Sequence, residues 1–159
     1  MIFLTVGTQL PFDRLIKLVD DLVPELDEEV VGQIGFGKYQ PKNMHWTSSL
    51  TAVEFDKRAA EASVIVSHAG IGSVLTAKRF RKPIVVFPRA ATLGEHRNDH
   101  QLATASLLFG RPGIYIANNA ASLGTALRQA HTLRRPTNEE SAERGQLVSF
   151  LRETMQPAR

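Results

Sequence analysis

Short apolar runs alternate along the chain with longer segments in which apolar residues recur every three or four positions. The short runs are continuous rather than alternating, which is typical of strands buried on both faces. They predict strands at residues 2–6, 29–34, 44–47, 63–67, 83–87 and 113–116. The periodic segments predict helices at about 12–23, 51–62, 71–80, 100–109, 121–133 and 139–155.

This regular alternation of strands and helices predicts a parallel sheet that is covered by helices on both faces. We therefore expect one domain over residues 1–159, with an open, doubly wound α/β fold of the Rossmann type. In folds of this kind, ligands bind at the carboxyl ends of the strands.

Two of the predicted strands end in glycine turns that lead directly into helices. Gly7 and Thr8 follow the first strand, whereas Gly70, Gly72 and Ser73 follow the fourth. Such turns direct free backbone N–H groups, at the positive end of a helix dipole, toward a ligand. The turns therefore favour a phosphate-bearing ligand, with tight turns that only serve packing as the alternative.

The fourth-strand turn matches other phosphate-binding motifs poorly. The third glycine of a G-x-G-x-x-G dinucleotide fingerprint would fall on Leu75, and the sequence contains no G-x-x-x-x-G-K-[ST] loop. A nicotinamide-dependent enzyme is therefore the weaker alternative, and no cofactor is expected.

The segment 95–101 places polar and ionisable side chains before a helix. His96 and His100 are four residues apart, but a zinc site usually needs a third well-placed ligand, so no metal is expected. Carboxylate and amide groups at a helix start are better suited to binding sugar hydroxyls, although a solvated helix start remains open. The candidate substrate-binding residues here are Glu95, Asp99, His100 and Gln101.

His68 ends the fourth predicted strand, so we expect it at the rim of the cleft. Two roles are open for it. Its imidazole either fixes the shape of the loop through hydrogen bonds to the backbone, or it contacts the ligand and transfers a proton.

Composition and charge exclude several classes of function. The chain has no cysteine, which excludes disulfides and thiolate chemistry, and no apolar run long enough for a signal peptide or a membrane span. We expect a cytoplasmic protein. The net charge is +3 and the basic residues are scattered, so no nucleic-acid partner is expected. Those residues form either a solvated surface or a face toward an acidic ligand or lipid.

Several motifs together carry a family resemblance. Phe3–Thr8 is followed by Phe12–Ile16, and Val66–Ser73, Lys82–Pro88 and Asp99–Gln101 come later in the same order and spacing. These segments resemble the C-terminal, donor-binding domain of family-28 glycosyltransferases. The N-terminal segment resembles the stand-alone versions of that domain, which are the PssE-type proteins and the small cytosolic subunit of the two-part UDP-GlcNAc transferase.

The resemblance implies half of an enzyme. Complete members of the family have two Rossmann-like domains, one for a lipid-linked acceptor and one for a UDP-sugar. This chain would bind the UDP-sugar and pair with a membrane-associated acceptor-binding subunit of the PssD type. The pair would transfer the sugar, with inversion, to a lipid-pyrophosphate-linked saccharide in exopolysaccharide or capsule synthesis, at the inner face of the plasma membrane. A non-catalytic enhancer or scaffold for a separate transferase is the other hypothesis.

The resemblance also implies roles for individual residues. It places the glycine turns at the nucleotide and its diphosphate, and the polar segment at the sugar. The catalytic base is expected from the partner subunit, with two histidines of this chain as lesser candidates. By similarity the residues are Gly7 and Thr8 for the diphosphate, Gly70, Gly72 and Ser73 for the nucleotide, Asp99 and Gln101 for the sugar, and His68 and His96 as candidate bases.

Overall fold

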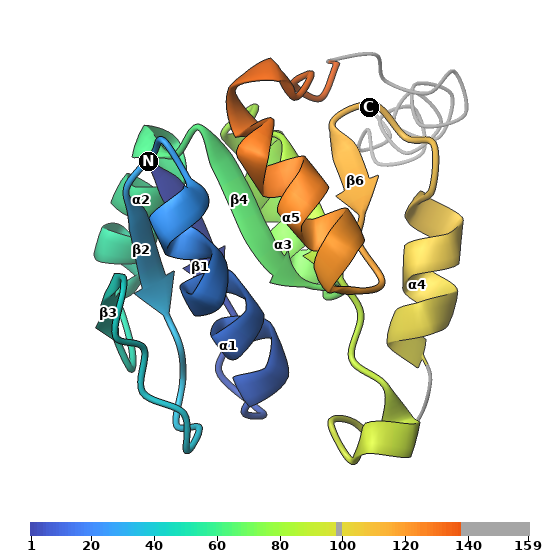
Figure 1. The fold of residues 1–159 in the computed structure, drawn as a ribbon. Coiled ribbons are helices and arrows are strands. Elements are labelled where there is room, and N and C mark those ends of the chain that lie inside the picture. The colour runs from blue at the N-terminus through green and yellow to red at the C-terminus, as the bar shows by residue number, and fades with distance from the viewer. Residues whose placement is uncertain (98–99, 138–159) are drawn as a thin grey trace, which may run out of the picture.

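The computed structural model describes residues 1–97 and 100–137 of the 159-residue chain (Figure 1). The predicted helix at 139–155 and the candidate residue Asp99 lie outside the described residues.

The six predicted strands are present and form one parallel sheet in the order β3-β2-β1-β4-β5-β6. This arrangement confirms the predicted Rossmann-type α/β fold. The strands are β1 (Ile2–Thr5), β2 (Val30–Gln33), β3 (His45–Thr47), β4 (Val64–His68), β5 (Ile84–Phe87) and β6 (Ile114–Ile116).

Helices cover both faces of the sheet (Figure 1). Two of them, α1 and α5, pack on one face, and the other three pack on the opposite face. The helices are α1 (Asp13–Leu22), α2 (Ala52–Glu61), α3 (Ile71–Arg79), α4 (His100–Leu108) and α5 (Ala120–Arg128).

The two faces of the sheet are packed differently. On the α1 and α5 side, branched residues such as Ile16 and Leu123 bury against Leu4 and its neighbours. On the other side, each helix turns a buried alanine to the sheet, which brings the helix backbone close to the strands. These alanines are Ala59 in α2, Ala77 in α3 and Ala105 in α4.

The predicted start of α2 is confirmed, and the predicted end of α5 is wrong. Thr51 and Glu54 form the expected capping box. The helix predicted to continue to Leu133 ends at Arg128, because the backbone at Gln129 leaves the α region (φ −105°, ψ 18°). A 3₁₀ turn, Ala130–Thr132, follows and places Ala130 in the core.

The order of the strands reverses between β1 and β4. From β1 the sheet continues to β2 on one side, and from β4 it continues to β5 on the other. Thr5 lies opposite Gln33 of β2 on one side and opposite Ser67 of β4 on the other. The chain leaves β1 toward α1 on one face and leaves β4 toward α3 on the other. Because these two loops diverge, a crevice opens between them, which is where ligands bind in such folds.

Candidate functional site

A cavity of about 650 Å³ occupies this crevice, bounded by the loop after β1, the start of α2 and the start of α3. The structure brings seven of the predicted site residues together in its lining. They are Gly7, Thr8, His68, Gly72, Ser73, His96 and Gln101.

The remaining predicted residues are placed elsewhere or are not described. Gly70 is the N-cap of α3 and is not one of the residues that line the cavity. Glu95 is also outside the lining, and both of its carboxylate oxygens bond to Arg14, 2.6 Å away in each case. Only the backbone of His100 is described, at the first residue of α4.

The two glycine turns pack directly against the imidazole of His68. Gly7 has φ +77°, and a Cβ there would lie 2.9 Å from Cε1 of His68. A Cβ on Gly70 would overlap Nε2 of the same ring. His68 is therefore wedged between the turns, as expected if it fixes their shape. The predicted catalytic roles of His68 and His96 stay predictions.

Burial, together with the positive charge of Arg89 and the proximity of His96, lowers the pKa of His68 to about 4. The imidazole is therefore neutral at physiological pH, where it can donate one hydrogen bond and accept another. In the ligand-free chain it is a weak base.

Polar side chains at the carboxyl ends of β1 and β2 are buried in the cavity lining, a feature that sequence patterns did not reveal. Thr5 Oγ1 donates to Oε1 of Gln33 at 2.7 Å. The amide of Gln33 in turn donates to the carbonyl oxygens of Gly7 and Ser48, each at 3.1 Å. This network ties the β1 loop to the loop after β3.

Two of the predicted ligand-binding side chains also hold loops in place. Ser73 Oγ accepts a hydrogen bond from Ser67 at 2.8 Å, which fastens the start of α3 to β4. Gln101 accepts from the N–H groups of Ala69 and Arg89, at 3.3 and 3.1 Å, and so joins the loops after β4 and β5.

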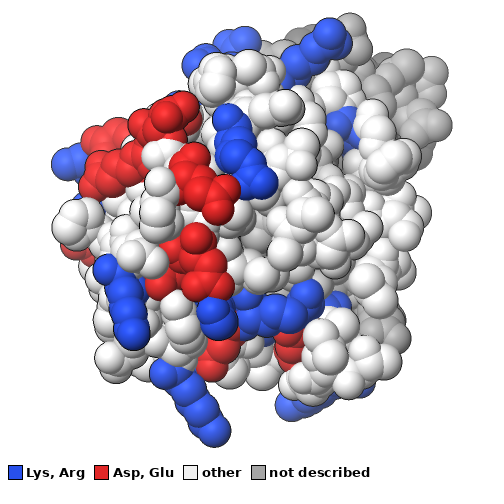
Figure 2. All heavy atoms as spheres, viewed as in Figure 1, with Lys and Arg blue, Asp and Glu red and all other residues white. Residues whose placement is uncertain are grey.

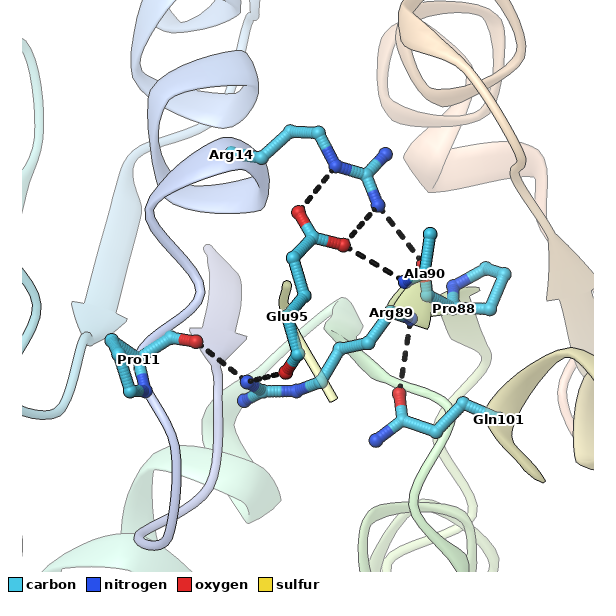
Figure 3. Close-up of polar contacts among 7 residues, drawn as sticks. All are labelled: Pro11, Arg14, Pro88, Arg89, Ala90, Glu95 and Gln101. Carbon is cyan, nitrogen blue, oxygen red and sulfur yellow. Dashed lines mark hydrogen bonds and ion pairs between the residues drawn. The ribbon is translucent and has the colours of Figure 1, made fainter. Parts of the chain in front are cut away.

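A second network, shown in Figure 3, joins α1 to the loop after β5. The Arg14–Glu95 ion pair is completed by Ala90, whose N–H donates to Glu95 at 2.9 Å. Burial disfavours the charged carboxylate, but these donors and the charges of Arg14 and Arg89 outweigh that cost and lower the pKa of Glu95. Arg89 also lines the cavity, and the sequence analysis missed it.

Several broader properties of the described residues bear on the site. Within residues 1–97 and 100–137 there is no group of three His, Asp or Glu side chains placed to hold a metal ion. None of the helices in that part of the chain is long and apolar enough to cross a membrane. Figure 2 shows acidic side chains gathered in the upper left part of the face that carries α1, with basic side chains around and below them.

The strand order, with glycine turns and a cavity at the switch point, is that of a Rossmann-type ligand-binding domain. The model of the glycosyltransferase family 28 C-terminal domain matches residues 1–147. The chain therefore belongs to this family.

Individual relatives agree with the assignment. The chain is 30% identical over 140 residues to the UDP-N-acetylglucosamine transferase subunit ALG13 of Yarrowia lipolytica, covering 78% of this chain and 68% of that protein. The solution structure of ALG13 has a TM-score of 0.58 at 17% identity and is matched over 97% of this chain and 96% of its own length.

Larger glycosyltransferases share the fold over part of their length. The glycotransferase of kitacinnamycin has a TM-score of 0.63 at 21% identity, with 96% of this chain matched to 38% of that one. MurG of Acinetobacter baumannii has a TM-score of 0.54 at 19% identity, with 96% of this chain matched to 49% of that one. The chain thus spans less than half of these two enzymes.

The packing of the glycines gives a prediction with a matched control. We expect Gly70→Ala to destabilise the fold by about 1–3 kcal/mol, because its methyl group collides with His68. Nothing lies within 4 Å of a Cβ on Gly72, which is inside α3, so Gly72→Ala should be neutral or stabilising by up to about 1 kcal/mol. Urea unfolding measures both, and equal effects would contradict the packing described here.

The lowered pKa of His68 gives a prediction about pH. Between about pH 6.5 and 4 the unfolded chain binds a proton at this imidazole and the folded chain does not, so the free energy of unfolding falls as the pH falls. His68→Gln should remove this part of the slope. Urea unfolding of both proteins from pH 8 to 4 tests it, and identical slopes would show that the folded state does not resist protonation.

Proposed function

We propose that the chain is the donor-binding subunit of a two-part inverting glycosyltransferase that uses a UDP-sugar. The observation that carries the proposal is the cavity where the β1 loop meets the N-terminus of α3. That helix has a glycine N-cap with no side-chain cap, so its first N–H groups are available to oxygens of a diphosphate. The family membership and the similarity to the UDP-N-acetylglucosamine transferase subunit of Yarrowia support the same ligand class.

The chemistry needs two kinds of assistance. The acceptor hydroxyl oxygen bonds to the anomeric carbon from the face opposite UDP, and the bond from that carbon to the diphosphate oxygen breaks. The bonding electron pair leaves with UDP, while the hydroxyl proton passes to a base. Gly7, Thr8 and the start of α3 stabilise the charge that develops on the diphosphate.

The base comes from a partner subunit in this proposal. His68 is a weak base in the ligand-free chain, because its pKa is about 4, and the binding of a diphosphate would raise that pKa. His96, which also lines the cavity, is the other candidate on this chain.

The rest of the assembly follows from the family resemblance. The partner is a membrane-associated, acceptor-binding subunit of the PssD type, and the acceptor is a lipid-pyrophosphate-linked saccharide. The pair acts in exopolysaccharide or capsule synthesis at the inner face of the plasma membrane. The Yarrowia relative is a subunit of a transferase, which supports a partner for this chain.

Titration calorimetry of the chain with UDP-sugars tests the proposal. We expect a dissociation constant below about 1 mM, in the usual range of enzyme–substrate affinities. Gly72 lines the cavity and has open space around a Cβ, so Gly72→Asp adds a carboxylate there and should weaken binding more than about tenfold by repelling the diphosphate. Thr125→Asp adds the same charge on an exposed position of α5 and serves as the control.

Two results would contradict the proposed function. An absence of binding up to millimolar UDP-sugar would overturn the donor-binding role and favour a non-catalytic enhancer or scaffold subunit. Equal weakening by Gly72→Asp and Thr125→Asp would show that the ligand binds elsewhere.

A further inference from the structure

Arg89 follows β5 and is almost completely buried, with 2% of its surface exposed. Its guanidinium donates hydrogen bonds to four backbone carbonyl oxygens, two of which are shown in Figure 3. Three of the four belong to the loop between β1 and α1. The acceptors are Pro11 at 2.6 Å, Leu10 at 2.8 Å, Val6 at 2.9 Å and Glu95 at 3.4 Å.

In the described part of the chain, no hydrogen bond joins this guanidinium to a carboxylate. Within residues 1–97 and 100–137, every hydrogen-bond acceptor of Arg89 is a neutral carbonyl oxygen. The Glu95 carboxylate accepts instead from Arg14 and the Ala90 N–H. Burial accordingly lowers the pKa of Arg89, an effect that the Glu95 charge opposes, but an arginine keeps its proton in proteins. A positive charge therefore lies in the cavity wall.

The hydrogen bonds of Arg89 also orient the β1 loop. The C=O and N–H of one planar peptide unit point in opposite directions. Since the carbonyl of Val6 points to Arg89, the N–H of Gly7 in the same unit points away from it. The oxygens that would repel an anion are thus gathered around the guanidinium.

Two further contacts hold Arg89 itself. Its Cζ atom lies 4.6 Å from the centroid of the Phe12 ring, a cation–π distance. The backbone N–H of Arg89 donates to the side-chain oxygen of Gln101, which also accepts from the backbone N–H of Ala69 in the β4 turn. Arg89 therefore links the loops after β1, β4 and β5, all of which border the cavity.

We propose that Arg89 is a positioning residue for the diphosphate of the donor: it orients the β1 loop and supplies buried positive charge to the cavity wall. The proposal rests on the proposed function, since it assumes that a nucleoside diphosphate binds there. A lysine cannot replace this arrangement, because it carries a single nitrogen and lacks the planar fork that reaches several carbonyls at once.

The test compares UDP with uridine, which lacks the diphosphate. Protein-observed NMR titration gives dissociation constants into the millimolar range for both ligands. For Arg89→Met we expect UDP affinity to fall about 10- to 30-fold, the size of a lost interaction with a charged group, and uridine affinity to stay within about twofold. Arg128→Met removes the same charge from an exposed ion pair on α5 and is the control, with both affinities retained.

A purely structural role would lower both affinities together, so an unchanged ratio of UDP to uridine affinity overturns the proposal. If Arg89→Met does not fold, Arg89→Lys is titrated with the same two ligands. We then expect the ratio of UDP affinity to uridine affinity to fall about threefold. If the unaltered chain binds no UDP, the proposed function fails, and the role of Arg89 in it fails as well.

Discussion

The pairing of β1 with both β2 and β4 is the constraint on which the rest of the structure depends. The sheet grows in one direction from β1 and in the other from β4, so the two loops leave toward opposite faces. The crevice is thus a consequence of strand order. The glycine turns then shape the crevice, because a Cβ at Gly7 or Gly70 would collide with the His68 ring that lies between them.

The buried polar groups at this edge of the sheet hold the loops that border the cavity. Thr5, Gln33 and Ser67 are each at most 4% exposed, and each is satisfied by a hydrogen bond at the carboxyl end of a strand. Burial of such groups is costly unless they are paired, and apolar residues would fill the same space without that cost. Their bonds hold the turns, so the cavity exists before a ligand arrives.

The sequence predicted the parts of the fold that depend on local patterns. Apolar runs located the described strands other than β3 (His45–Thr47), and the spacing of Thr51 and Glu54 located the start of α2. The end of α5 was missed, because its residues remain compatible with a helix and tertiary packing of Ala130 decides the turn.

The sequence predicted the loops of the candidate site but not the hydrogen bonds that hold these loops in place. A glycine turn can be recognised from a few neighbouring residues, whereas the hydrogen bond from Arg89 to Val6 joins residues 83 positions apart. No spacing along the chain reports such a pair. The charge of Glu95 suggested a ligand contact, and the structure adds that its carboxylate bonds to Arg14 of α1.

The central claim, that a UDP-sugar binds in the crevice between the β1 loop and α3, is tested most directly by mapping which backbone amide resonances shift on addition of UDP-N-acetylglucosamine. We expect the largest shifts in residues 7–10 and at Gly72, Ser73 and Thr76, which line the cavity. Shifts confined to Leu108, Arg111, Gly113 and Ile114, which line a separate groove beside α3, would contradict the claim.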